Sequence, residues 1–385
     1  MLFFMSNTKN KILFFCTFPP PNTGQTIGTK LTFECVNECI GTADKINIVD
    51  KNRLSRKSGD FSLSHLIKLL GHIFSLFTKT ISNNYETVYV VFGSTKFSLI
   101  RDVFYTFIIK TFSKAKLIAQ LHSGNYGDNF QNGLSKRIFP WLLSRVDVLI
   151  FSSPMLNRIG DKIPASRTAY LPNMISSDII CTDEEIKEKM ERKSRKSHFD
   201  IFYISNMIAE KGYSDLVKAA ELFKKTDPEN DFTVHLVGGW PSQKIRADFE
   251  SELVTGNMEN NVKIYGSVVD RKMLKDFFLL ADVFVLPTYY PIEAQPYSII
   301  EALNAATPVI STYHASIPDL IQNDSNGFLV QPKDTVAIAA ALQKLTDREK
   351  WMKTAVTARE SYKSNYDQPV IIPKIKHIFL GSAPY

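Results

Sequence analysis

The fold of this chain is decided by the stretch Glu293-Ala-Gln-Pro-Tyr-Ser-Ile-Ile-Glu301, which follows the apolar run Val283–Pro287. The run is typical of a buried strand, and Pro296 suits the first turn of a helix that continues from Tyr297. A helix that begins just beyond the carboxyl end of a strand is typical of a parallel α/β sheet. Its first turn has unpaired backbone N–H groups and a positive dipole end, which together favour a bound diphosphate.

Two glutamates frame this helix start. Glu301 lies one to two turns along the helix, where a carboxylate can accept hydrogen bonds from both hydroxyls of a nucleoside ribose. Glu293 lies in the preceding loop and is expected at the sugar end of the same ligand. The alternative is that both are solvated side chains beside a helix, as most charged residues are.

A second stretch of the same kind comes earlier, Tyr203-Ile-Ser-Asn-Met-Ile-Ala-Glu-Lys211-Gly212. Lys211 can neutralise a diphosphate as a compact, mobile charge, and Gly212 permits a close backbone turn. A Lys-Gly pair alone is a weak signal. Together with a helix start that carries two glutamates, in this order and in one α/β unit, it is a specific one.

Short apolar strands alternate with amphipathic helices along the whole chain, which predicts two doubly wound parallel sheets. The expected strands are Lys11–Phe18, Lys45–Val49, Thr87–Phe92, Lys116–Leu121, Val146–Phe151, Arg167–Leu171, Phe199–Ser205, Phe232–Val237, Val262–Tyr265, Val283–Pro287 and Thr307–Ser311. The expected helices lie near 63–81, 97–112, 213–225, 242–255, 271–280, 297–306 and 334–345.

The stretch Cys181–His198 is charged throughout and lacks a sustained apolar face, so it reads as a linker. We therefore expect an acceptor-side domain over 1–172, a linker over 173–198 and a second domain over 199–350. A helical segment over 351–385 is expected to cross back to the first domain. The default ligand site is the cleft between two such domains.

Composition indicates a globular, cytoplasmic protein. The 385 residues are 44% apolar and 22% charged, and the four cysteines form no zinc-like cluster with histidines. The apolar run 12–18 is too short for a signal peptide and leads into three prolines. The run 97–112 contains three charged residues, so it is not expected to span a membrane.

The positive charge lies in the first half. Residues 1–180 hold 21 Lys and Arg against 11 Asp and Glu, whereas the remainder holds 25 against 28. This imbalance indicates an anionic neighbour such as a lipid phosphate, a membrane surface or a nucleic acid. Basic residues alternate with apolar ones over 63–81 and 97–112, which fits membrane contact or ordinary packing on a sheet. No nucleic-acid-binding motif accompanies the charge.

The second half resembles the donor-binding domain of retaining glycosyltransferases of family four, a group with the GT-B fold that serves bacterial surface polysaccharides. The resemblance rests on Lys211-Gly212 and on Glu293 and Glu301, which stand eight positions apart. It covers most of residues 200–332. It implies two Rossmann-like domains that face a cleft and a nucleotide-sugar donor held by the second. The implied donor-binding residues are Asn206, Lys211, Gly239, Ser267, Val268, Gln295, Pro296, Tyr297, Ser298 and Glu301.

One residue pair and one single residue depart from the pattern of the family. Ser205-Asn206 stands where the family has Gly-Arg, so one cation for the diphosphate is absent. Ala294 stands where a Gly or Ser is usual, which is a minor change.

The first half matches the family more loosely. Gly24 lies in a Pro- and Gly-containing loop after the first strand, like the family's loop near the donor sugar. His122, at the end of Lys116–Leu121, resembles the family's active-site histidine, so the implied catalytic set is Glu293, Lys211 and His122. Taken alone, such a loop is a simple turn and such a histidine is more often structural.

The resulting hypothesis is a retaining, metal-independent hexosyltransferase without a cofactor. Its donor would be a UDP-sugar, or a GDP-sugar, and its acceptor a glycan or polyprenyl-linked sugar at the inner face of the membrane. No Asp-x-Asp pair occurs to hold a bridging metal ion. The alternatives are a nucleotide-sugar epimerase of the same fold and a basic nucleic-acid-binding module.

Overall fold

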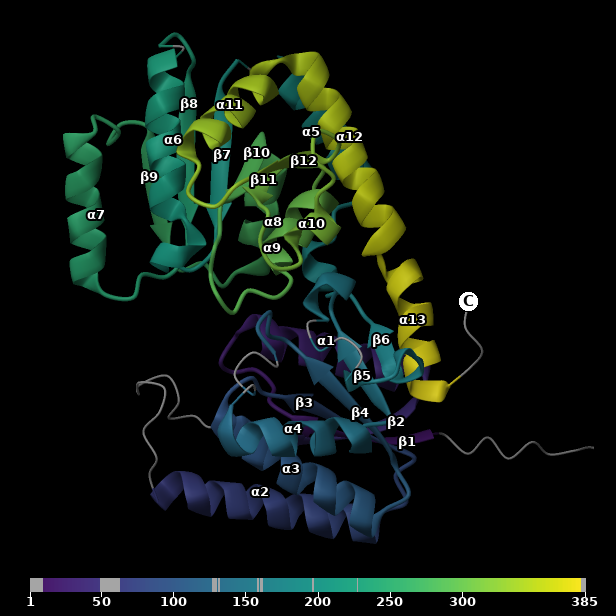
Figure 1. The fold of residues 1–385 in the computed structure, drawn as a ribbon. Coiled ribbons are helices and arrows are strands. Elements are labelled where there is room, and N and C mark those ends of the chain that lie inside the picture. The colour runs from purple at the N-terminus through teal and green to yellow at the C-terminus, as the bar shows by residue number, and fades with distance from the viewer. Residues whose placement is uncertain are drawn as a thin grey trace, which may run out of the picture. The chain divides into compact units, whose positions relative to one another are not determined.

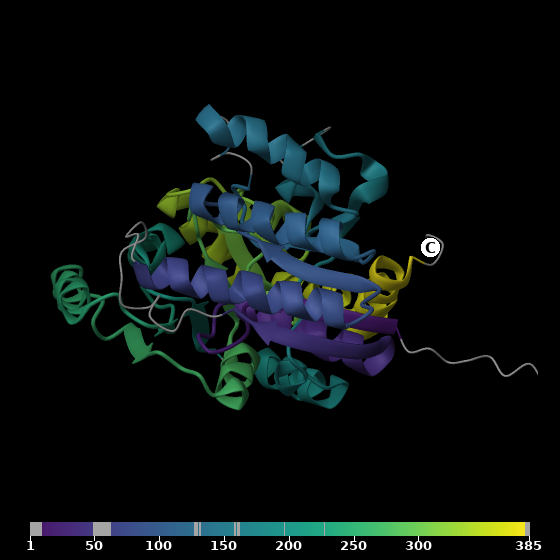
Figure 2. The same cartoon turned by 90° about the horizontal axis from the view of Figure 1, so that it is seen from below.

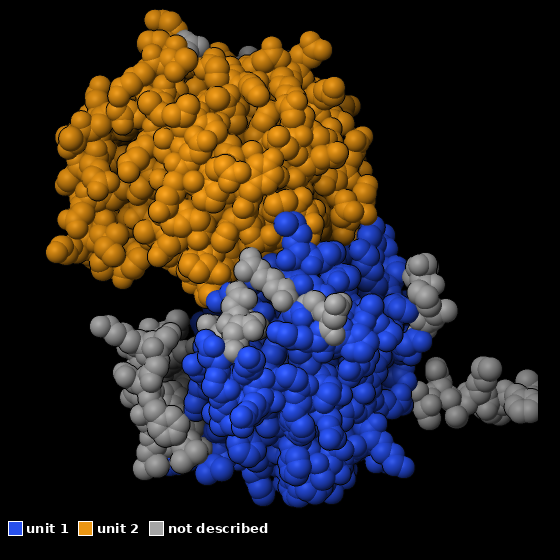
Figure 3. All heavy atoms as spheres, in the orientation of Figure 1, with its two compact units in different colours: residues 1–174, 368–385 blue, residues 175–367 orange. Residues whose placement is uncertain are grey.

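The computed structural model describes residues 10–48, 63–126, 130, 132–157, 159, 162–195, 197–226 and 228–381. It divides into two compact units: unit 1 comprises residues 1–174 and 368–385, and unit 2 comprises residues 175–367 (Figure 3). Each unit contains one parallel six-stranded sheet with helices between its strands (Figure 1). The predicted fold class, α/β with two doubly wound sheets, is confirmed.

Unit 1 has the strand order β2-β1-β3-β4-β5-β6, and all its strand pairs are parallel. Every residue of β3 is buried, as expected for a strand inside a parallel sheet. The elements are β1 (Asn10–Cys16), α1 (Gly24–Cys39), β2 (Gly41–Asn47), α2 (Leu63–Ser82), β3 (Thr87–Phe92), α3 (Lys96–Phe112), β4 (Lys116–Leu121), α4 (Gly133–Arg145), β5 (Val148–Phe151), β6 (Thr168–Tyr170) and α13 (Gln368–Leu380).

The second strand begins earlier than the sequence predicted. Strand β2 starts at Gly41 rather than Lys45, and the expected end at Val49 lies outside the described residues. It is an edge strand with alternating exposure, so its first residues carry no apolar signal. Gly41 pairs with Asn10, and a Cβ on Gly41 would lie 2.4 Å from the Asn10 carbonyl oxygen.

The C-terminal helix α13 belongs to unit 1. Its buried face includes Ile371, Ile375 and Phe379, and the Phe379 ring stacks on Phe14 of β1 at 5.9 Å. The Lys116 ammonium donates to the carbonyl of Ile378 at 2.8 Å, which fixes the end of the helix against β4. The last helix of the chain thus completes the core of the first sheet.

Unit 2 has the strand order β12-β11-β10-β7-β8-β9, again with parallel pairs. Its elements are α5 (Asp183–Arg195), β7 (Phe199–Ile204), α6 (Tyr213–Thr226), β8 (Phe232–Val237), α7 (Gln243–Thr255), β9 (Val262–Gly266), α8 (Arg271–Leu280), β10 (Val283–Leu286), α9 (Tyr297–Asn304), β11 (Val309–Thr312), α10 (Ile317–Leu320), β12 (Gly327–Val330), α11 (Thr335–Thr346) and α12 (Arg348–Asn365).

The charged segment expected as a linker is in large part a helix of unit 2. Helix α5 buries two lysines completely. Lys189 donates to the carbonyls of Phe278 and Ala305 at 2.9 and 2.8 Å, and Lys193 pairs with Asp282 at 2.6 Å. The methylene stems of these lysines cover apolar surface while their ammonium groups donate to buried acceptors. A hydrophobicity pattern therefore does not predict that this face of the helix is buried.

Among the described helices, none combines the length and the apolar character that crossing a bilayer requires.

Candidate donor-binding site

The site is built where the strand order of unit 2 reverses. Strand β7 lies between β10 and β8. From β7 the chain continues to β8 and β9 on one side, and it then returns to β10, β11 and β12 on the other side of β7. In open parallel sheets, ligands bind beyond the carboxyl ends of the strands at such a reversal. The loops after β7 and β10 carry Lys211 and Glu293, the two residues that the sequence singled out.

The Lys211 turn has a fixed geometry. A 3₁₀ turn over Ala209–Lys211 ends at Gly212, which has φ of +82°. A Cβ on Gly212 would lie 2.4 Å from the carbonyl oxygen of Pro287, so only glycine fits. The backbone N–H of Tyr289 donates to the carbonyl of Glu210 at 2.7 Å. The two loops are therefore bound to each other through their backbones.

Lys211 and Glu293 form an ion pair across these loops. The Lys211 Nζ lies 2.5 Å from Glu293 Oε2, and the side chains are 14% and 8% exposed. The Thr288 hydroxyl donates to the same carboxylate oxygen at 3.2 Å. The Lys211 ammonium also lies 5.1 Å from the centre of the Tyr290 ring, a cation–π distance. In the free protein, Glu293 thus neutralises the cation predicted for the diphosphate.

The helix that follows Glu293 begins without a side-chain cap. Pro296 is the N-cap of α9 and no side chain accepts from its first-turn N–H groups. Gln295 and Pro296 are buried, whereas Tyr297 and Ser298 are partly exposed. Within the described residues, the buried Tyr297 hydroxyl has no hydrogen-bond partner, and burial raises its pKa well above the usual range. These groups leave donors free at the start of the helix.

Glu301 is held by an arginine that the sequence did not reveal. Arg271 Nη2 donates to Glu301 Oε1 at 2.7 Å, and the Glu301 side chain is 7% exposed. Burial raises the pKa of Glu301, and the charge and hydrogen bond of Arg271 oppose that rise. The one sequence signal for Arg271 is its place as the first residue of α8, where the helix dipole disfavours a cation.

Three residues predicted for the nucleotide side meet in space. A Cβ on Gly239 would lie 3.7 Å from Asn206 Oδ1 and 3.8 Å from Ser267 Cβ, which are ordinary contacts. The neighbouring Gly238 differs, because a Cβ there would lie 1.8 Å from the carbonyl oxygen of Ser205. Folding therefore requires glycine at 238, whereas a Cβ at 239 would make only ordinary van der Waals contacts. Val268 packs against the core from the same loop as Ser267.

The two candidates of the first half lie in unit 1. Gly24 is the first residue of α1, directly after the N-cap Thr23 in a capping box with Thr26. His122 follows β4, and its Nε2 is buried without a hydrogen-bond partner among the described residues. Burial lowers the pKa of His122 to about 4, so the imidazole is neutral at pH 7.

The described residues contain no group of three or more His, Cys, Asp or Glu side chains that could hold a metal ion. The four cysteines are free.

Part of the chain that contains this site matches a known protein family. Residues 198–348 match the family model described as "Glycosyl transferases group 1". The chain carries a group 1 glycosyltransferase domain. Lys211, Glu293, Arg271 and Glu301 all lie inside this domain, whereas His122 lies outside it. The predicted resemblance to a glycosyltransferase domain is confirmed over residues 198–348.

Several curated relatives are named for the biosynthesis of bacterial polysaccharides. The amylovoran biosynthesis glycosyltransferase AmsK of Erwinia amylovora is 25% identical over 46% of this chain and 44% of its own length. The putative teichuronic acid biosynthesis glycosyltransferase TuaC of Bacillus subtilis is 25% identical over 63% of this chain and 58% of its own length. The chain spans about half the length of the curated relatives that it matches.

Solved structures extend the likeness of fold to the whole chain. Sucrose-phosphate synthase from Thermosynechococcus elongatus has a TM-score of 0.74 at 16% identity, over 97% of this chain and 98% of that one. The Anabaena protein HepE, solved with UDP, has a TM-score of 0.70 at 17% identity, over 97% and 100%. The predicted GT-B fold is therefore confirmed, with the group 1 domain as its second half.

Proposed function

We propose that this protein is a retaining, metal-independent glycosyltransferase of bacterial surface polysaccharide synthesis. It transfers a hexose or N-acetylhexosamine from a nucleotide-sugar to a glycan or lipid-linked acceptor. The observation that carries the proposal is the pair of buried cation–glutamate contacts, Lys211–Glu293 and Arg271–Glu301, on either side of the uncapped start of α9. A nucleotide-sugar needs both a cationic diphosphate site and a carboxylate for the ribose.

Each group in the site has one task in this mechanism. The ammonium of Lys211 and the first-turn N–H groups of α9 stabilise the negative charge that develops on the diphosphate as the glycosidic bond breaks. Once Lys211 engages the diphosphate, Glu293 is released to accept hydrogen bonds from hydroxyls of the donor sugar. Glu301 accepts from the ribose. Gly239 lies beside Asn206 and Ser267, and these three residues contact the nucleotide.

His122 is the catalytic candidate of unit 1. Its imidazole is neutral at pH 7, because burial lowers its pKa to about 4, and its Nε2 has no partner among the described residues. Such a group can hydrogen-bond a substrate without first losing a partner or a proton.

A nucleotide panel tests the proposal directly. UDP, GDP and ADP and their glucose conjugates are titrated calorimetrically into the full chain, and UDP is the first choice because HepE was solved with it. Binding in the micromolar range by one of them, lost in Glu301→Gln, is the expected result. If no nucleotide diphosphate binds at millimolar concentration, the protein is not a transferase of this type.

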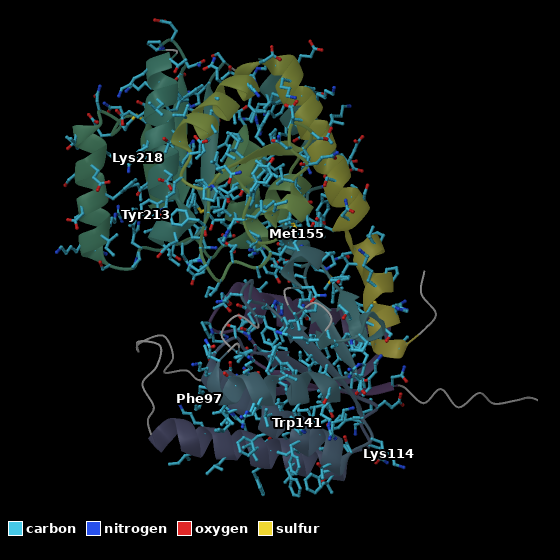
Figure 4. The ribbon with its side chains drawn as sticks, viewed as in Figure 1. Phe97, Lys114, Trp141, Met155, Tyr213 and Lys218 are labelled. Atoms are coloured by element: carbon cyan, nitrogen blue, oxygen red, sulfur yellow. The ribbon has the colours of Figure 1, made fainter. Side chains whose placement is uncertain are left out.

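A basic, apolar surface on unit 1 supports peripheral contact with a membrane. Helices α2 and α3 pack against each other, and Figure 2 shows them side by side in blue. Their exposed apolar residues recur at helical spacing: Ile67, Leu70, Phe74 and Ile81 on α2, and Phe97, Ile100, Phe104 and Phe107 on α3, with exposures between 46% and 68%. Figure 4 labels Phe97 at the start of α3. We call these eight residues the apolar face.

The charges around the apolar face match an anionic lipid surface. Helices α2, α3 and α4 together hold eight Lys and Arg residues and one acidic residue, the fully buried Asp102; two of the eight are paired, Arg101 with Asp102 and Lys110 with Asp147. Juxtaposed apolar and cationic side chains bind the interface of anionic bilayers, each basic residue adding about 1 kcal/mol. We infer that this surface docks the enzyme where lipid-linked acceptors are found.

Vesicle sedimentation tests the membrane contact. Wild-type protein is expected to sediment with vesicles of phosphatidylcholine and phosphatidylglycerol, less so in 0.5 M salt, and to stay in solution with phosphatidylcholine alone. The variant Phe74→Ser/Phe104→Ser should reduce sedimentation at least fivefold, whereas Val336→Ser, which is 68% exposed on α11, should not. Equal sedimentation of both variants, or concentration-dependent dimers that the first variant abolishes, would refute lipid docking.

A further inference from the structure

Unit 1 contains a buried polar cluster that the proposed mechanism does not use. It consists of Arg101 and Asp102 of α3, Tyr105 one turn later, and Tyr126 in the segment after β4. It lies close to the reversal of strand order in the first sheet, where β1 sits between β2 and β3. Phe15 of β1 contacts Tyr105 edge-on at 4.8 Å, and Gly93, which follows β3, contacts Asp102.

Arg101 and Asp102 form a fixed pair. Adjacent helical residues do not normally face each other. Here Arg101 donates from Nε and Nη2 to Asp102 Oδ1 at 2.8 and 2.6 Å, while Gly93 N–H donates to Oδ2 at 2.9 Å. Both carboxylate oxygens are thus occupied. Arg101 Nη1 has no partner among the described residues, and the Arg101 side chain remains 24% exposed.

Two tyrosine hydroxyls beside this pair have no partner. Tyr105 and Tyr126 are 2% and 1% exposed, and neither hydroxyl makes a hydrogen bond within the described part of the chain. The Arg101 guanidinium lies 5.7 Å from the centre of the Tyr105 ring. Burial raises the pKa of both tyrosines, Tyr105 to about 12. The charge of Asp102 adds to this rise and the charge of Arg101 opposes it. A buried hydroxyl without a partner is costly, so such a group needs an explanation.

The cluster therefore offers donors and no free carboxylate acceptor. Arg101 Nη1 and two phenolic O–H groups need acceptor oxygens, and a phosphate or carboxylate supplies several of them on one centre. A neutral sugar hydroxyl can also accept from these donors, but an anionic oxygen makes the stronger, charge-assisted hydrogen bonds. The position at the strand-order reversal is where a doubly wound sheet binds its ligand.

We propose that Arg101, Tyr105 and Tyr126 form a binding site for an anionic oxygen group, a phosphate or a uronate carboxylate, on the acceptor. The term acceptor rests on the proposed glycosyl transfer, whereas the anion site itself does not. Asp102 is a positioning residue, which holds the guanidinium so that Nη1 stays available.

Calorimetry with inorganic phosphate tests the site. All titrations use the full chain with Lys211→Met, so that the donor site does not compete for phosphate. Phosphate should bind this background, bind at least fivefold more weakly to Tyr105→Phe/Tyr126→Phe, and show no binding to Arg101→Gln. The control Arg145→Gln, an exposed arginine of α4, should bind as the background does.

Thermal unfolding without phosphate separates a binding role from a structural one. Because the two hydroxyls have no partner among the described residues, Tyr105→Phe/Tyr126→Phe should keep or raise the Tm. Tyr85→Phe, which loses a 2.6 Å hydrogen bond to Asp44, should lower the Tm and leave phosphate affinity unchanged. A lowered Tm in the double variant with unchanged phosphate affinity would overturn the proposal, because the hydroxyls would then serve the fold.

Two further binding experiments identify the source of the anion and distinguish this proposal from the proposed transferase function. Farnesyl phosphate is compared with farnesol, and glucuronate with glucose; the anion of the natural acceptor should bind at least tenfold better than its neutral analogue. Equal binding of both members in both pairs would refute an anion site. UDP titrated into Arg101→Gln without the Lys211 change should bind as it does to wild type. If the wild-type protein binds phosphate but no UDP, the proposed transferase function is refuted and the anion site is not.

Discussion

Lys211 Nζ lies 2.5 Å from Glu293 Oε2, although the two residues stand on loops after different strands. The contact unites the cation predicted for the diphosphate with the carboxylate predicted for the sugar. A donor that draws Lys211 to its diphosphate must therefore free Glu293 at the same time. In the proposed mechanism, binding of the diphosphate by Lys211 and release of the Glu293 carboxylate are therefore one event.

The first prediction concerns this pair. Lys211→Met should lower turnover at least tenfold, because the leaving diphosphate loses its cation. It should also cost about 1–3 kcal/mol of unfolding free energy, since Glu293 is left buried and unpaired. Steady-state kinetics and urea unfolding measure the two effects, and Lys218→Met, an exposed lysine of α6, is the control.

A double variant separates catalysis from stability at this pair. Lys211→Met/Glu293→Gln should regain most of the lost stability, because the unpaired charge is gone, and none of the lost turnover. Wild-type turnover in either Lys211 variant would remove this lysine from the mechanism.

The two glutamates should differ in their kinetic effects. In the proposed mechanism Glu301 contacts the ribose, which does not change during the reaction, so Glu301→Gln should raise the donor KM more than it lowers kcat. Glu293 is proposed to contact the transferred sugar, whose anomeric carbon becomes positive, so Glu293→Gln should mainly lower kcat. Initial rates against one donor decide the matter, with circular dichroism to confirm folding. A reversed pattern would contradict the assignment.

Arg271 should set the pH at which the donor binds. Burial raises the pKa of Glu301 and Arg271 opposes the rise, so Arg271→Gln should raise that pKa further. Protonated Glu301 cannot accept from both ribose hydroxyls, so the variant should lose UDP affinity at a higher pH than wild type as the pH falls. Calorimetric Kd values between pH 5 and 8 measure this shift. Arg246→Gln, which affects an exposed pair on α7, should leave the profile in place.

His122 should make the protein less stable in mild acid. Its pKa is lowered to about 4 when folded, against about 6.5 when unfolded, so the unfolded chain binds the proton first. The contribution is complete above pH 6.5 and is lost as the pH falls towards 4, with a limiting slope of about 1.4 kcal/mol per pH unit. His122→Asn should remove this one-proton contribution from the slope of unfolding free energy against pH between pH 4 and 6.5. An unchanged slope would mean that His122 titrates normally.

Chelation should leave activity intact. The chain has no Asp-x-Asp pair, and Lys211 with the α9 N–H groups supplies the positive charge near the diphosphate. Transfer rates in 5 mM EDTA should match those in buffer alone. A loss restored by magnesium or manganese would contradict the site as proposed.

The sequence predicted the centre of each sheet better than its edges. Strands β3, β4 and β8 have the predicted bounds, because a strand buried on both faces reads as a continuous apolar run. Strand β12 was missed because it is only four residues long, although all four are buried, and β2 was misplaced because it is an edge strand without a buried residue. Helix α5 was taken for a linker because its buried positions include lysines.

The sequence by itself determined the two α/β units, the Lys211 turn and the start of α9 with its two glutamates. These are local features, set by side-chain period, by glycine and proline geometry, and by spacing along the chain. Only the tertiary structure decided that Lys211 pairs with Glu293, that Arg271 holds Glu301, and that two tyrosines stand unpartnered beside Arg101. Those contacts join residues from different elements, and charge interactions of this kind depend on distance and burial, which no local pattern encodes.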